Sequence, residues 1–411
     1  MIKKISAVVL ALTLTVCSFA GCSSKKDSSS SESDVSAVSS EAAGPDNSTA
    51  EKTEVPDPSF TVGGEKIDTA DYVMCTIDGI DITFDEFRFY YYYTLNSYTT
   101  NYGITADSLK ENEDTFKQFM DDVILCIKQE LVTQKLAQDN DIELDDDDKK
   151  TIDSQLENVK SNYESEEAYQ NDLKQGYLTE DVYYTMLERA QIYSKVVDTL
   201  FKNDGKYATK KDDFLKIVKD TDQYCREIHV MIPYYSQVDL DDSTADSFDS
   251  MTLSQKASAK QSAYSALDED GQAAAKEKAK KVADEVLEKA KNGDDFEKLV
   301  EEYGWDVGLE DTTNGYYFEK DNTSGYPEEL VDAVFKLKEN QVCDKVVENT
   351  TYGYFIIKRL KVDMDYVNEN LETMIYSYDQ PAIQEVYNDV IDKMKVTYCD
   401  SWDKITADSI T

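Results

Sequence analysis

The hydrophobic pattern of this 411-residue chain changes its period at Tyr224, and that change constrains the fold more than any other feature. From about 71 to 222, apolar residues recur mostly at helical spacing. From about 223 to 362 the pattern becomes a strand, a long helix and further strands, and beyond 363 it is helical again. We therefore expect an α+β protein in which a mostly helical part flanks a part that combines strands with helices.

Local signals place the individual elements. Residues 73–77 read as a strand, Asp78-Gly79 as a hairpin turn, and residues 80–82 as the returning strand. Thr83 then caps a helix, with Glu86 in the capping-box position. Helices are expected at about 84–98, 113–139, 145–162, 165–175, 179–202, 268–292, 330–337 and 383–394, and further strands at about 226–232, 354–358 and 395–399.

The acidic run from Asp145 to Asp148 has two interpretations. A calcium loop of the EF-hand type needs Gly at its sixth position and Glu at its twelfth, where this chain has Lys150 and Leu156. Acidic side chains also stabilise a helix N-terminus. The sequence therefore favours a helix start and predicts no metal site here.

The N-terminus has the order of a secretory signal. Lys3 and Lys4 precede an apolar run over residues 5–20, which ends in the sequence FAGC at Cys22. This ending resembles a bacterial lipobox, which implies removal of residues 1–21 and lipidation of Cys22 on the outer face of the bacterial cell membrane. An ordinary secreted protein is the alternative. A spanning helix is disfavoured because a run of about 16 residues is shorter than the roughly 20 that a bilayer needs.

Composition limits the partners and the connection to the membrane. Residues 22–70 are rich in Ser, Glu, Asp and Ala, and are expected to form a disordered tether. The whole chain has 84 acidic and 43 basic residues, a formal net charge of −41. Nucleic acid is therefore excluded as a partner, since its phosphates need clustered Lys and Arg. Direct adhesion to an anionic membrane is disfavoured too, so the lipid on Cys22 must hold the protein.

Cysteine and histidine usage limits the chemistry. Besides Cys22, the mature chain would keep Cys75, Cys126, Cys225, Cys343 and Cys399, an odd number without a C-x-x-C pair. Their pairing is left open, with Cys75 and Cys399 the two that we expect to lie closest. The single histidine, His229, leaves almost no material for a zinc site. We expect neither a metal nor a cofactor.

An aromatic run over residues 87–93 is the densest in the chain. One interpretation is a broad buried helix face. The other is an amphipathic crevice that grips unfolded chains, because tyrosine combines a large ring with a polar tip.

The N-terminal segment resembles the chaperone domain of the SurA and PrsA families. The resemblance rests on CTIDGIDITFDEF, ILCIKQELVTQKLAQDNDIELDDDD and ESEEAYQNDLKQGYLTEDVYYTMLE, which keep the family order. It implies a mostly helical chaperone domain over 71–222. In PrsA-like proteins a C-terminal segment, here 363–411, returns to complete that domain, which would bring residues 396–399 near the opening hairpin.

Residues 223–362 resemble a parvulin, or PpiC-type, peptidyl-prolyl isomerase. The resemblance rests on EIHVMI, NGDDFEKLVEEYGWD, NGYYF, PEELVDAVFKLKENQV and YGYFIIK. It implies an inserted α/β domain with a small antiparallel sheet and surrounding helices. The acidic, serine-rich stretch over 236–270 departs from the family pattern, and argues against selectivity for phosphorylated substrates.

The same resemblance implies the site residues. His229 matches the first of two family histidines, Asp306 an acidic or thiol position, and Thr350 a hydroxyl, which are the three expected catalytic residues. The second histidine is replaced by Phe355, so we expect His229 to have lost its partner. The expected substrate-binding residues are Tyr326, Leu330, Phe335 and Phe355.

Two functions follow from these resemblances. The first is an extracytoplasmic, lipid-anchored foldase that isomerises X–Pro bonds in unfolded or partly folded secreted proteins. The second is a non-enzymatic holdase chaperone with a degenerate parvulin domain. A solute-binding lipoprotein is disfavoured because no repeated βαβ pattern is present. The sequence leaves open whether the chain forms a homodimer.

Overall fold

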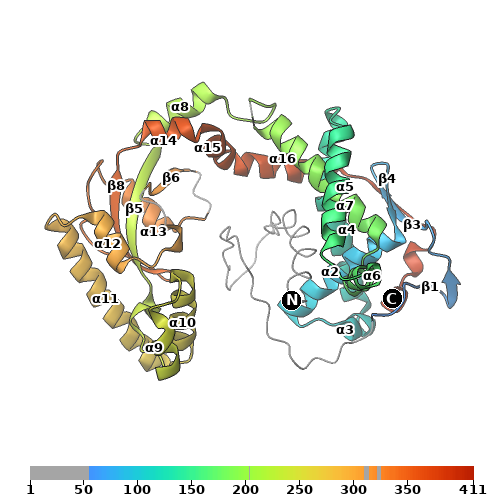
Figure 1. Cartoon of the computed structure of the whole chain (residues 1–411), viewed down its shortest axis with the longest axis horizontal. Coiled ribbons are helices and arrows are strands. Elements are labelled where there is room, and N and C mark those ends of the chain that lie inside the picture. Colours follow the sequence, from blue (N-terminus) through green and yellow to red (C-terminus); the bar gives the residue numbers. More distant parts are fainter. Residues whose placement is uncertain (1–54, 203, 310–313, 322–324) are drawn as a thin grey trace. The chain divides into compact units, whose positions relative to one another are not determined.

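The structure is a computed structural model that describes residues 55–411 except 203, 310–313 and 322–324. Its described residues form two compact units (Figure 1). Unit 1 comprises 55–208 and 379–411, and unit 2 comprises 209–378. The expected signal peptide and Cys22 lie outside the described residues. Within the part that is described, no helix combines the length and apolar character needed to cross a bilayer.

Unit 1 is mostly helical and contains a small antiparallel sheet of order β4-β3-β9 and a separate hairpin, β1-β2. Its strands are β1 (Phe60–Val62), β2 (Glu65–Ile67), β3 (Val73–Ile77), β4 (Ile80–Thr83) and β9 (Val396–Tyr398). Its helices are α2 (Phe84–Tyr102), α3 (Ala106–Glu111), α4 (Glu113–Asp139), α5 (Asp146–Ser161), α6 (Glu166–Gln175), α7 (Glu180–Val196), the π-helical η2 (Val197–Phe201), α16 (Gln380–Lys393) and the short η5 (Trp402–Lys404).

Helix α4 is the centre of unit 1 and spans the residues that its apolar pattern predicted. It packs against α2, α7 and α16. Residues of its apolar face, among them Phe119, Val123 and Ile127, are fully buried. The core therefore joins segments from both ends of the chain.

The C-terminal strand completes the sheet of unit 1. Strand β9 pairs antiparallel with β3, with Cys75 opposite Tyr398 and Ile77 opposite Val396. The N–H of Cys399 donates to the carbonyl of Met74 at 3.0 Å. Cys399 is thus a neighbour of Cys75, but no disulfide joins the two thiols.

The expected tether over 22–70 contains two strands in its described part, which corrects that expectation for residues 60–67. Residues 60–67 form the β1-β2 hairpin around Gly63 and Gly64, both with positive φ. Phe60 is fully buried, and the N–H of Thr61 donates to the carbonyl of Ser409. The buried Phe60 and the backbone contacts with the C-terminal residues therefore hold this hairpin in place.

Two interpretations of unit 1 are decided by burial and capping. Asp145 caps α5 and accepts from the N–H groups of Asp147 and Asp148, so the helix start is confirmed. In the aromatic run of α2, four aromatic residues and Arg88 are buried, and Tyr92 and Tyr93 are half-buried. This run therefore forms mainly a packed face: Phe87, Phe89, Tyr90 and Tyr91 are 0–8% exposed.

An ion pair is buried between α2 and α7. Arg189 Nη1 lies 2.6 Å from Glu86 Oε1, and both side chains are almost inaccessible to solvent. The same guanidinium donates to the hydroxyl of Tyr90 at 3.2 Å. Glu86, expected as a capping-box residue, is instead aimed into the core.

Unit 2 is built around a four-stranded antiparallel sheet of order β6-β5-β8-β7. Its strands are β5 (Tyr224–Ile232), β6 (Tyr316–Glu319), β7 (Val347–Asn349) and β8 (Gly353–Leu360). Its helices are α8 (Lys211–Lys219), η3 (Tyr234–Gln237), α9 (Asp242–Phe248), α10 (Leu253–Ser265), α11 (Glu269–Lys291), α12 (Phe296–Tyr303), η4 (Val307–Leu309), α13 (Glu328–Val334), α14 (Met364–Glu369) and α15 (Leu371–Tyr378). The α+β class, with small antiparallel sheets among helices, is confirmed.

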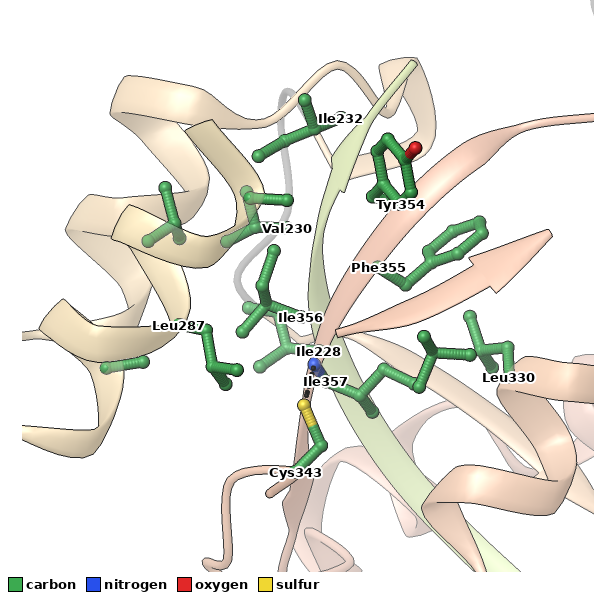
Figure 2. Packing of buried hydrophobic residues seen from close by; sticks show 14 of the residues in the cluster. Ile228, Val230, Ile232, Leu287, Leu330, Cys343, Tyr354, Phe355, Ile356 and Ile357 are labelled. Atoms are coloured by element: carbon green, nitrogen blue, oxygen red, sulfur yellow. Dashed lines mark hydrogen bonds between the residues drawn. The ribbon is translucent and has the colours of Figure 1, made fainter. Parts of the chain in front are cut away.

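The central strands β5 and β8 give the sheet two different faces. Val230 pairs with Ile356 across the two strands, and Met231 pairs with Phe355. Figure 2 shows Val230 and Ile356 on the side of Leu287 from α11, and Phe355 on the other side with Leu330 from α13. Because alternate residues of a strand point to opposite faces, His229 shares the face of Phe355.

The structure divides the chain at 208 and 378, rather than at the expected 222 and 362. The segments between these positions carry α8, α14 and α15, which share a small core. Phe214 and Val367 are fully buried in it, and Phe214 contacts Tyr224 at the start of β5. These helices therefore join the unit whose first strand they pack against.

Candidate active site

The candidate site lies on the face of the sheet that carries His229. Strand β5 supplies Glu227 and His229, two residues apart and therefore on one face. The neighbouring strand β6 places Tyr316 directly opposite Glu227. Asp306 follows α12, whose C-terminal chain is held to β5 by a hydrogen bond from Trp305 N–H to the carbonyl of Met231.

The single imidazole lies between two carboxylates. His229 Nδ1 lies 3.1 Å from Glu227 Oε1, and His229 Nε2 lies 3.0 Å from Asp306 Oδ2. A neutral imidazole has one N–H, so it can donate to only one of these oxygens. An imidazolium can donate from Nδ1 to Glu227 and form an ion pair with Asp306 at Nε2, although the Nε2 contact does not have the geometry of a hydrogen bond.

The electrostatics agree with a charged imidazole. Burial of His229 acts to lower its pKa, but the negative charges of Glu227 and Asp306 and their contacts outweigh burial and raise it to about 10. Burial likewise acts to raise the pKa of Asp306. The contacts with His229, Tyr316 and the backbone of Gly308 outweigh it and leave this pKa below its ordinary value.

Asp306 is fixed by donors on both oxygens. Oδ2 accepts from the hydroxyl of Tyr316 at 2.9 Å, and Oδ1 accepts from the N–H of Gly308 at 2.9 Å. A side chain at position 308 would displace this phenol, because a Cβ there would lie 2.1 Å from the Tyr316 hydroxyl oxygen. Burial and the nearby Asp306 raise the pKa of Tyr316, so its phenol stays protonated.

Two aromatic rings enclose the imidazole. The ring of Tyr316 stacks on His229 at 5.7 Å between centroids, and the ring of Phe355 meets it edge to face at 5.1 Å. Aromatic rings within about 6 Å of a cation stabilise it. Phe355 thus packs against the imidazolium from the strand position where the family has its second histidine.

The residues of this cluster differ in how much of their side chains solvent can reach. Glu227 and His229 are 0% and 4% exposed, whereas the side chain of Asp306 retains 21% of its accessible surface. Tyr316 is half-buried. Within this cluster, Asp306 and Tyr316 are therefore accessible to a bound molecule, whereas Glu227 and His229 are not.

The expected substrate-binding residues lie in the adjoining core. Tyr326 and Phe335 are half-buried, and both rings contact Phe318. Leu330 and Phe355 are only 1% and 2% exposed, so in this structure they support the site from below. The expected hydroxyl residue, Thr350, is exposed in the turn between β7 and β8, and no described contact joins it to His229 or Asp306.

The expectation that His229 has lost its partner is wrong. Its Nδ1 contacts Glu227, and its ring contacts Tyr316 and Phe355. Glu227 and Tyr316 were not anticipated from the sequence. The only available signal was a charged residue, Glu227, two positions before His229 and therefore on the same face of the strand. In the described part of the chain, no cluster of His, Cys, Asp and Glu is arranged to hold a metal ion.

Comparison with known proteins places this unit in a family. Residues 247–362 match the model of the PPIC-type PPIASE domain. The foldase protein PrsA of Bacillus subtilis is 33% identical over 122 residues, which are 28% of this chain and 40% of that protein. The foldase protein PrsA of a Geobacillus species is 40% identical over 81 residues, which are 20% of this chain and 28% of that protein.

Among solved structures, PrsA from Bacillus subtilis covers 79% of this chain and 93% of its own, at 20% identity and a TM-score of 0.26. PrsA from Bacillus cereus covers 81% and 96%, at 17% identity and a TM-score of 0.30. The sequence match spans well under two thirds of the curated relatives' length. The matched domain begins after His229, yet β5 is central to the same sheet. The chain therefore carries a PPIC-type PPIase domain and is similar to the PrsA foldases.

Proposed function

We propose that unit 2 is a parvulin-type peptidyl-prolyl cis-trans isomerase within an extracytoplasmic foldase that is anchored through a lipid on Cys22. The observation that supports this most is the His229–Asp306 pair, held at 3.0 Å on the sheet of a PPIC-type domain. Unit 1, corresponding to the chaperone domain expected over 71–222 and 363–411, would bind unfolded or partly folded secreted proteins.

The chemistry required is modest, because no bond is made or broken. Rotation about a peptide bond has a barrier of roughly 18–20 kcal/mol, which arises from amide resonance. Resonance places negative charge on the carbonyl oxygen. A fixed carboxylate such as Asp306 close to that oxygen disfavours the planar amide relative to the twisted one.

The proline ring would rest on the half-buried aromatic residues beside Asp306. Tyr326 lies 5.7 Å from Tyr316, ring to ring, and 4.5 Å from Phe318. Phe335 lies 6.1 Å from Phe318. Leu330 and Phe355 form the floor under these rings, and Thr350 would act only if its turn moved towards the site.

An isomerisation assay on one short proline peptide tests the proposal. Wild type should accelerate isomerisation, and Asp306→Asn and Tyr316→Phe should reduce kcat/KM with little change in far-UV circular dichroism. Asp332→Asn is the matched control, since this exposed carboxylate on α13 pairs with Lys336 alone among the described residues. An inactive wild type, or an Asp306→Asn variant as active as the control, would contradict the isomerase.

A non-enzymatic holdase is the second candidate. The burial of Leu330 and Phe355 favours it, because it leaves a proline ring only Tyr326 and Phe335 to contact. A holdase would suppress aggregation of a denatured test protein while leaving peptide isomerisation at the uncatalysed rate. Sedimentation at several concentrations would test the homodimer at the same time.

A further inference from the structure

Glu227 has the contacts of a positioning residue for His229. Its carboxylate is completely buried, and His229 Nδ1 lies 3.1 and 3.3 Å from its two oxygens. A buried carboxylate without a cationic partner is destabilised by several kcal/mol. Among the described residues, His229 is the one cation paired with it.

The neighbouring cation is engaged elsewhere. Arg359 lies opposite Glu227 in the register of β5 and β8. Its guanidinium instead donates to the carbonyl oxygens of Leu337, Thr221 and Tyr224. His229 must therefore carry the charge that balances Glu227.

The other ionisable groups around Glu227 stay neutral. Cys225 shares its strand, and Tyr316 and Tyr326 approach from outside that strand. Burial is the main cause that raises the pKa of each of the three. Asp306, on the far side of the imidazole, adds a second negative charge. The charged groups at this position are therefore two carboxylates, Glu227 and Asp306, and one imidazolium, His229.

We infer that Glu227 takes the part that the resemblance assigned to the missing second histidine: it keeps His229 doubly protonated and holds the ring with Nε2 3.0 Å from Asp306 Oδ2. Phe355 fills the vacated position with an aromatic ring that suits a cation. This site is therefore a rebuilt network rather than a decayed one. The effect of Glu227 on catalysis depends on the proposed isomerase activity, whereas the protonation state of His229 does not.

The state of His229 can be read directly, because it is the single histidine of the chain. Untagged mature protein with ¹⁵N-labelled histidine gives two ring nitrogen signals and no others. At pH 8 the wild type should show both nitrogens protonated. In Glu227→Gln the apparent pKa should fall from about 10 towards the ordinary value of about 6.5. At that limit the imidazolium fraction at pH 8 drops roughly thirtyfold.

Three variants separate charge from structure. Glu227→Asp keeps the charge and should retain the imidazolium, while Glu227→Gln keeps the volume and should lose it. Glu319→Gln, a carboxylate of β6 in the same sheet, is the matched control and should titrate like wild type. Wild-type signals of a neutral imidazole at pH 8 would overturn the inference, and this measurement needs no variant to fold. A Glu227→Gln spectrum identical to wild type would overturn it too.

Activity supplies the second readout. If unit 2 is an isomerase, kcat/KM of wild type should be nearly flat from pH 6 to 8, whereas that of Glu227→Gln should fall as pH rises. A pH-independent loss in Glu227→Gln would reduce Glu227 to a structural residue and refute the positioning role. An inactive wild type with an imidazolium at pH 8 would refute the proposed function and leave the assignment of Glu227 to His229 standing.

Discussion

The buried ion pair of unit 1 should respond to mutation in a way that an exposed pair cannot. Arg189 and Glu86 side chains are 8% and 7% exposed, and their closest atoms are 2.6 Å apart. Arg189 also donates to Tyr90 and lies in the field of Glu130. Replacing Arg189 alone leaves Glu86 buried without its cation, and replacing Glu86 alone removes the carboxylate nearest to the buried Arg189.

The size of the effect follows from burial. Removing one partner of a buried pair destabilises a protein by about 3–5 kcal/mol, while replacing both with apolar residues is often neutral. Arg189→Met leaves two carboxylates, Glu86 and Glu130, and should be near the upper value. Glu86→Leu leaves Arg189 with Glu130 and Tyr90, and should be near the lower one. The double variant should lie closer to wild type than Arg189→Met does.

Urea unfolding of unit 1 can be followed by its own tryptophan. The chain has two, Trp402 in unit 1, packed on Phe87 and Tyr398, and Trp305 in unit 2. In a Trp305→Phe background, fluorescence therefore reports unit 1 alone. With an m-value of about 2.5 kcal/mol/M, a loss of about 4 kcal/mol moves the midpoint down by roughly 1.5 M.

An exposed pair provides the control. Lys117 and Glu113 on α4 lie 2.8 Å apart with side chains 65% and 82% exposed. Lys117→Met should change stability by less than about 1 kcal/mol. Losses that simply add in the Arg189→Met/Glu86→Leu variant would refute the reasoning, because the two residues would then not be compensating each other.

The remaining predictions concern unit 2 and the N-terminus. Because the pKa of His229 is raised in the folded state, its stabilising effect is complete below about 6.5 and is lost as pH rises towards about 10. The difference in unfolding free energy between wild type and His229→Asn should therefore shrink as pH rises through that window. Trp305 fluorescence in a Trp402→Phe background measures it, and a difference that stays constant would contradict the raised pKa. Leu330→Ala should destabilise unit 2 by about 2–5 kcal/mol, and Leu330→Met by less than about 1.5, as measured by urea unfolding; an unchanged midpoint for the alanine variant would show that Leu330 is not core. Cys22→Ser should release the protein into the medium or leave it unprocessed on fractionation, and mature protein still held in the membrane would exclude the lipid anchor.

The sequence by itself determined much of the local structure and pointed to two residues, His229 and Asp306, that the fold brings together. The helix over 113–139 follows from its apolar spacing, and the start of α5 from Asp145 as its cap. These signals are contained within a few turns of chain, so no distant contact is needed to read them. His229 and Asp306 were identified by position in short motifs, and the structure places them 3.0 Å apart.

Only the tertiary structure decided which distant groups meet. The pairing of β3 with β9 joins residues more than 300 positions apart, and the β1-β2 hairpin is ordered by contacts with the C-terminal chain. From the sequence, Leu330 could line a pocket or belong to the core, and its burial in the structure places it in the core. Glu227 was one carboxylate among 84 acidic residues, and its role depends on a buried imidazole beside it, an engaged Arg359, and a phenylalanine where a histidine was expected. The protonation state of a side chain depends on its burial and on the charges around it. In this site most of those neighbours come from distant parts of the sequence, so the order of residues along the chain does not reveal them.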